Sequence, residues 1–131
     1  MPRNRFVSAD VTRIEISDGD WIELKTDLNT GDQKKLENAG LLPPVMIDGK
    51  LINPIDWTIY ELLRAEIFLK DWSFRGPDDK PVPLSMDAIR NLDPETFTEI
   101  STAIFEHVTK RSDQKKLARN TLKASSFQTS T

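Results

Sequence analysis

Residues 53–72 read NPIDWTIYELLRAEIFLKDW, and this stretch decides the architecture of the chain. Asn53 can accept a hydrogen bond from the first free amides of a helix, and Pro54 suits the next position because its missing N–H would be unpaired there. We therefore expect a helix from Ile55 to about Trp72. Its apolar residues cover more than one stripe, so the helix needs more than one neighbour, which is either the centre of the fold or the seam of an oligomer.

Two β-hairpins are predicted before this helix. Residues 11–24 alternate with period two on either side of a turn at Ser17-Asp18-Gly19-Asp20, and a second hairpin spans residues 45–52 around Asp48-Gly49. An Asp-Gly pair favours such turns because glycine adopts positive φ without a steric penalty. Between the hairpins, residues 30–39 are polar and permit a short surface helix that Gly40 ends. The acidic residues of the first turn resemble part of a calcium loop, but the other ligands of an EF-hand loop are absent from the sequence, so a turn is the better interpretation.

Two further helices are predicted after a loop at residues 72–83 that is rich in glycine and proline. Ser85 and Asp93 are the expected N-caps, and Pro94 is the first residue of the second helix. Phe97, Ile100, Ile104 and Val108 recur at helical spacing and form a core or interface stripe. The predicted fold class is α+β, with small N-terminal β-hairpins followed by a mainly helical domain of three to four helices.

Charge divides the 131-residue chain into two parts. Residues 110–131 carry six basic residues and one acidic residue, a net charge of +5, whereas residues 1–109 carry −8 of the total of −3. We expect one globular domain at residues 1–109 and a flexible basic tail at residues 110–131. The tail either contacts nucleic acid or an acidic protein, or is a solvated extension that folds back on the acidic body.

The sequence offers few groups for catalysis or metal binding. It contains no cysteine and a single histidine, His107, for which a structural capping role or simple exposure is the better interpretation. No glycine-rich phosphate loop, H-E-x-x-H or G-x-S-x-G motif occurs, so we expect no enzyme, no cofactor, no metal and no catalytic residue. No signal peptide and no apolar run long enough for a membrane span are present, which predicts a soluble protein.

The order of these features resembles a known family. Asp18-Gly19-Asp20-Trp21-Ile22-Glu23-Leu24, the helix ending in Asp71-Trp72-Ser73-Phe74, the loop with Gly76 and Pro81-Val82-Pro83, residues 84–92 and Asp93-Pro94-Glu95 look like the tail assembly chaperones of long-tailed bacteriophages. The resemblance spans residues 11–109. It implies a protein of the host cytoplasm that binds the tape measure protein and recruits tail tube subunits while the tail polymerises, with self-association also possible.

An acidic body with an unusually apolar helix suits a protein that masks a helical partner, because helix faces and grooves engage amphipathic helices through spaced apolar anchors. The candidate partner-binding residues are Trp57, Leu63, Ile67, Trp72 and Phe74, and each of them is equally compatible with the core. Two other functions stay open at this point. One is a structural tail or connector subunit retained in the virion, and the other is a nucleic-acid-binding regulator that uses the basic tail.

Overall fold

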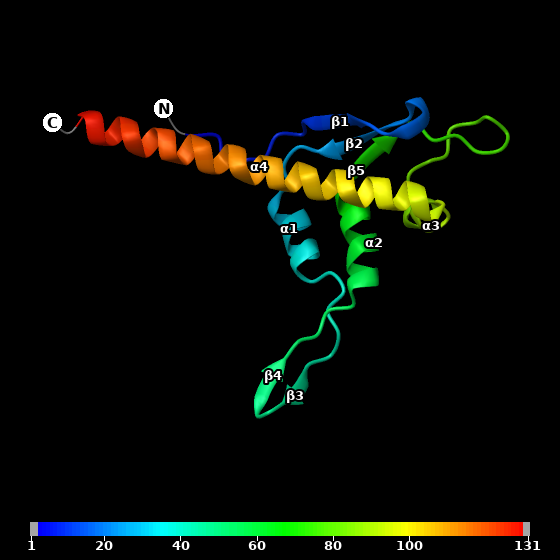
Figure 1. Cartoon of the computed structure of the whole chain (residues 1–131), viewed down its shortest axis with the longest axis horizontal. Helices are drawn as coiled ribbons and strands as arrows, with labels where there is room; N and C mark the ends of the chain where they lie inside the picture. The colour runs from blue at the N-terminus through cyan, green and yellow to red at the C-terminus, as the bar shows by residue number, and fades with distance from the viewer. Residues whose placement is uncertain (1–2, 130–131) are drawn as a thin grey trace.

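The computed structural model describes the backbone of residues 3–129 and the side chains of residues 3–120. A small sheet and a set of helices form the body, from which one hairpin and the end of the last helix project (Figure 1). The elements in chain order are β1 (Val11–Glu15), a 3-10 turn (Ser17–Gly19), β2 (Trp21–Lys25), α1 (Thr30–Glu37), β3 (Val45–Ile47), β4 (Lys50–Ile52), α2 (Trp57–Phe68), β5 (Leu69–Trp72), α3 (Met86–Arg90) and α4 (Pro94–Thr129). The predicted α+β class is confirmed.

The first predicted hairpin is confirmed as β1 and β2, which pair antiparallel with Ile14 opposite Ile22. Asp18 and Gly19 both have positive φ, as the tight turn requires. The second hairpin, β3 and β4, is also confirmed, and its turn again uses an aspartate and a glycine with positive φ, Asp48 and Gly49. It pairs with no other strand among the described residues, so it forms a separate two-stranded unit.

The expected start and end of the central helix were wrong. The N-cap is Asp56, whose side chain accepts hydrogen bonds from the amides of Thr58 and Ile59. Asn53 cannot cap a helix because the backbone around it is still extended, with Ile55 bridged to Leu41 across the base of the second hairpin. The helix therefore begins at Trp57, three residues after Pro54, the residue predicted for its first position.

The helix ends at Phe68, and the last four residues assigned to it form β5. This strand pairs antiparallel with β2 and completes a sheet in the order β1-β2-β5. Leu69 and Trp72 point into the core while the two residues between them are exposed. Some of the apolar residues that made the predicted helix apolar on most sides therefore belong to a strand. A continuous apolar run does not distinguish a buried helix from a strand.

The core lies between one face of this sheet and helices α2, α3 and α4. Its buried members are Ile22, Leu24, Ala65, Phe68, Leu69, Trp72, Ile89, Ile100, Ala103 and Ile104. The hydrogen bonds of Ser17 N–H and Oγ–H to the carboxylate of Glu99, at 3.0 and 2.6 Å, tie the first turn to α4. These bonds also hold the pKa of Glu99 below its usual value.

The predicted caps of the last two helices are confirmed. Ser85 Oγ accepts from the amide of Ala88, and Asp93 accepts from both the amide and the hydroxyl of Thr96. These hydrogen bonds lower the pKa of the Asp93 carboxyl group. Both helices therefore begin where the local sequence placed them.

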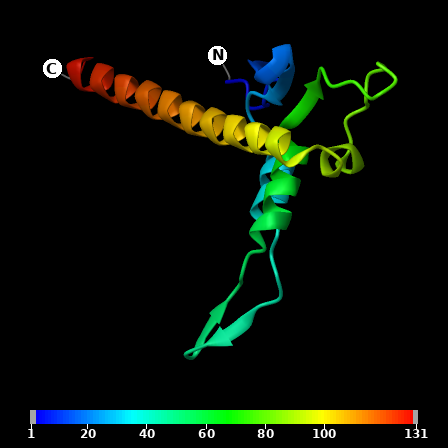
Figure 2. The same cartoon turned by 45° about the vertical axis from the view of Figure 1, so that its right-hand side comes forward.

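Helix α4 is 36 residues long and passes through the predicted domain boundary between residues 109 and 110. The expected tail is thus helical up to Thr129, and this part of α4 projects beyond the body (Figures 1 and 2). Arg111 contacts both carboxylate oxygens of Asp27, at 2.7 and 3.3 Å, and Lys115 lies 3.1 Å from the same group. The first basic turns of the segment therefore pair with the acidic body, as one of the two interpretations of its charge expected.

Candidate partner-binding surface

The structure separates the five candidate partner-binding residues. Trp57 is 65% exposed, Ile67 and Trp72 are each only 6% exposed, and Leu63 and Phe74 are half-buried. Leu63 and Ile67 lie on the side of α2 that borders α1. Trp57 is thus the only one of the five that presents most of its surface to solvent.

Trp72 and Phe74 are held by the body. The indole Nε1–H of Trp72 donates a 2.7 Å hydrogen bond to the carbonyl of Val82, and its ring lies 5.1 Å from that of Phe74. The carbonyl of Phe74 in turn accepts from the amide of Val82. These aromatic residues pack under the loop at residues 72–83, so they do not form an exposed platform on which a base could stack.

Many of the exposed large apolar side chains lie on a projecting hairpin, residues 41–55, which we call the arm. All six residues of β3 and β4 are exposed, and the arm extends away from α4 and the sheet (Figures 1 and 2). Its exposed apolar side chains are Leu41, Leu42, Val45, Met46, Ile47, Leu51, Ile52 and Ile55. Trp57 and Ile59 continue this surface onto the first turn of α2.

Backbone hydrogen bonds fix the base of the arm to the body. The amide of Leu42 donates to the carbonyl of Pro54 at 2.9 Å, and the amide of Asp56 donates to the carbonyl of Gly40 at 2.8 Å. Gly40 has φ +72°, and a Cβ there would lie 2.6 Å from the carbonyl oxygen of Asp56. Only glycine fits this close approach, so the arm leaves the body at a defined point.

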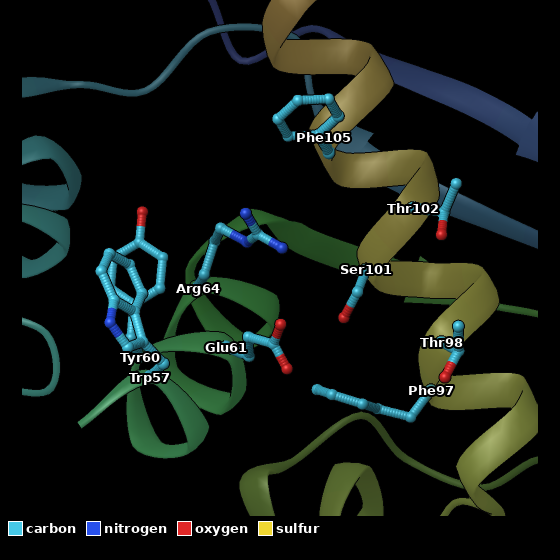
Figure 3. A pocket seen from close by; sticks show the side chains of 9 residues that line it. All are labelled: Trp57, Tyr60, Glu61, Arg64, Phe97, Thr98, Ser101, Thr102 and Phe105. Carbon is cyan, nitrogen blue, oxygen red and sulfur yellow. The ribbon is translucent and has the colours of Figure 1, made fainter.

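A groove of about 480 Å³ lies between α2 and α4 (Figure 3). Its aromatic walls are Trp57, Tyr60, Phe97 and Phe105. The rings of Trp57 and Tyr60 meet edge to face at 5.4 Å. We call this the α2–α4 groove.

Two polar groups in the α2–α4 groove have no hydrogen-bond partner. Arg64 Nε and Ser101 Oγ are both buried, and neither atom forms a hydrogen bond with a described residue. Both side chains point into the space between the two helices (Figure 3). Because an unpaired buried polar atom is unfavourable, these two atoms are a weak point in the packing between α2 and α4.

Sequence reasoning predicted the second hairpin but not the exposure of its side chains. The sequence does contain a sign of this exposure. The strands read VMI and KLI, and they lack the alternation of apolar and polar residues that is typical of a strand with one face on a core. Of the residues that line the α2–α4 groove, sequence reasoning singled out only Trp57, as a partner-binding residue, and Phe97, as part of a core or interface stripe. Arg64, Ser101 and Phe105 come together only when α2 crosses α4. The expectation of a capping role or simple exposure for His107 was wrong, because the residue is only 7% exposed and lies in the interior of α4. Its Nε2 lies 3.1 and 3.2 Å from the carbonyl oxygens of Lys25 and Thr26.

The described side chains include no group of three or more histidine, cysteine or acidic residues placed to hold a metal ion. Within the same described part of the chain, no helix combines the length and apolar character needed to cross a bilayer. Comparisons of the chain with models of protein families, with curated proteins and with solved structures find no match.

Proposed function

We propose that this protein is a non-enzymatic tail assembly chaperone of a long-tailed bacteriophage, which binds the tape measure protein in the host cytoplasm and helps to recruit tail tube subunits. The observation that carries the proposal is the arm. A hairpin whose six strand residues are all exposed, five of them apolar, needs a partner that covers it. The identity of that partner rests on the family resemblance of residues 11–109.

The arm suits transient binding of an apolar partner for two reasons. An isolated two-stranded hairpin is only marginally stable in water, so covering its faces stabilises the arm and the complex together. Its strands also have free edges, and extended hairpins or helix faces bind partners through alternating or spaced apolar anchors. Trp57, which follows the base of the arm, adds a large aromatic side chain of the kind that dominates binding energies.

The experiment is co-expression of the full chain with the tape measure protein encoded nearby, followed by size-exclusion chromatography of the soluble fraction. We expect the tape measure protein to be soluble only when this chain is present. Met46 and Leu51 are paired across the arm and are 66% and 67% exposed, so the double substitution Met46→Gln and Leu51→Gln removes apolar surface without opening the core. This variant is expected to lose the complex, as is Trp57→Ala.

The matched control is Phe6→Gln, which removes an 87% exposed aromatic residue outside the arm and should leave the complex intact. Circular dichroism establishes that each variant keeps its fold. An insoluble tape measure protein in the presence of the wild-type chain contradicts the proposal. Recovery of the chain from purified particles, in stoichiometric amounts, favours a structural tail or connector subunit instead.

A further inference from the structure

We propose that the tip of the arm binds the α2–α4 groove of a second copy of this chain. The inference goes beyond the proposed function and does not depend on it, because it concerns the purified chain alone. It starts from two surfaces that the fold leaves incomplete: an arm with no covering layer among the described residues and a groove with unpaired hydrogen-bond groups.

The arm cannot reach the groove of its own chain. Its base is fixed where α2 begins, by the hydrogen bonds at Leu42 and Asp56, and from there it runs away from α4 in both views (Figures 1 and 2). The groove lies on the opposite side of that base, between α2 and α4. An arm that enters such a groove must therefore come from another molecule.

The charges of the two surfaces are complementary. The arm carries one acidic and one basic residue, Asp48 and Lys50, at and beside its turn. The groove is lined by one basic and one acidic residue, Arg64 and Glu61. Asp48 would pair with the guanidinium group of Arg64, and Lys50 would face Glu61.

The apolar parts of the two surfaces also match. Met46, Ile47 and Leu51 flank the charged turn on the arm and are half or more exposed. The aromatic side chains that line the groove, which include Trp57 and Phe105, lie on either side of Glu61 and Arg64 (Figure 3). Burying apolar side chains around a central ion pair excludes water from it, which is the arrangement that gives well-defined interfaces.

The contact is heterologous, because each copy gives an arm to one neighbour and receives an arm from another. Such contacts build rings when the rotation between neighbours closes and open helical assemblies when it does not. The purified chain should therefore form oligomers whose size rises with protein concentration, and raising the salt concentration should weaken them.

Charge reversal tests the pairing. Asp48→Arg places two cations at the contact, and Arg64→Asp places two anions there, so each variant alone should associate about tenfold or more weakly than the wild type. In an equimolar mixture, the altered arm of the first variant can bind the altered groove of the second, and the unaltered arm and groove can bind each other. Both contacts then join opposite charges again, so analytical ultracentrifugation should show that the mixture regains wild-type association.

A second pair keeps the test valid if a substitution at Arg64 disturbs folding. Lys50→Glu and Glu61→Lys reverse the other two charges, and both positions are exposed. Circular dichroism is recorded for every variant, and Lys35→Glu, on the exposed face of α1, is the control for a change of net charge. A wild-type chain that stays monomeric up to millimolar concentration overturns the proposal, as does a mixture that associates no better than its components.

Discussion

Replacement of His107 by alanine tests how α4 is docked on the sheet. His107 is the only histidine of the chain, and its ring is buried with an edge-to-face contact to Phe68, at 6.3 Å between ring centres. Nε2 lies within hydrogen-bond distance of the carbonyl oxygens of Lys25 and Thr26. Since both partners are acceptors, the tautomer that makes these contacts is the one with a proton on Nε2.

The magnitude follows from two contributions. Loss of the shared hydrogen bond costs about 1 kcal/mol, because one N–H donor serves both carbonyl groups. Loss of the ring and its contact with Phe68 costs about 1–2 kcal/mol more, given that most of the side chain is buried. We therefore expect His107→Ala to lower the free energy of unfolding by about 2–3 kcal/mol in total.

The assay is urea denaturation followed by tryptophan fluorescence and by circular dichroism. With a slope of about 2 kcal/mol per molar urea, the midpoint should fall by about 1–1.5 M. His107→Gln should recover about 1 kcal/mol because its amide can donate to the same carbonyl groups. Glu106→Ala, at the exposed neighbouring position, is the control. If His107→Ala is no less stable than this control, the described docking of α4 on the end of β2 is incorrect.

Three further comparisons have expected effects on stability. Asp56→Ala should destabilise the protein by about 1 kcal/mol because it removes the observed cap of α2, whereas Asn53→Ala should have little effect in the same denaturation assay. Gly40→Ala should lower the free energy of unfolding by at least about 1 kcal/mol more than Gly49→Ala does. Both glycines have positive φ, but only at Gly40 would the added Cβ clash with a neighbouring atom. Thermal melts of the two variants measure the difference. The hydrogen bond from Arg111 is the main cause that lowers the pKa of Asp27 below its usual value. The pairing therefore contributes fully above about pH 4 and is lost as the pH falls through the lowered pKa. Asp27→Asn should therefore cost about 1 kcal/mol at neutral pH, since the pair is partly exposed, and denaturation at a series of pH values should show the difference shrinking below about pH 4. Equal stability of the two proteins at neutral pH would contradict this pairing.

Local signals in the sequence predicted most of the element boundaries. The turns at Asp18-Gly19 and Asp48-Gly49 and the caps Ser85 and Asp93 each depend on a few neighbouring residues, so a single sequence is enough to place them. The polar helix at residues 30–39 was likewise predicted, although it ends at Glu37, with Asn38 as its C-cap.

Tertiary contacts decided the features that the sequence analysis missed. Residues 69–72 continue the apolar pattern of α2, and only their pairing with β2 makes them a strand. The N-cap of α2 is Asp56 and not the predicted Asn53, because the base of the arm keeps the residues before Asp56 extended. The pairing of Arg111 and Lys115 with Asp27, on the part of α4 that follows residue 109, is a further tertiary contact that the sequence alone does not place.

The candidate partner-binding residues were chosen for their apolar character, which does not distinguish a core from an interface. Ile67 and Trp72 proved to be buried, while the side chains of the arm, which share the same character, proved to be exposed. The distinction depends on whether the chain itself covers a residue. For the arm, the described part of the structure provides no such cover.

Hydrogen–deuterium exchange of the chain with and without the tape measure protein tests whether the arm is the surface that a partner covers. The comparison is made at a concentration at which the chain alone is monomeric, so that contacts between copies do not contribute. We expect the amides of residues 45–52 to exchange more slowly in the complex, while those of the core helices exchange at unchanged rates. A complex in which the arm exchanges as fast as in the free chain would contradict it.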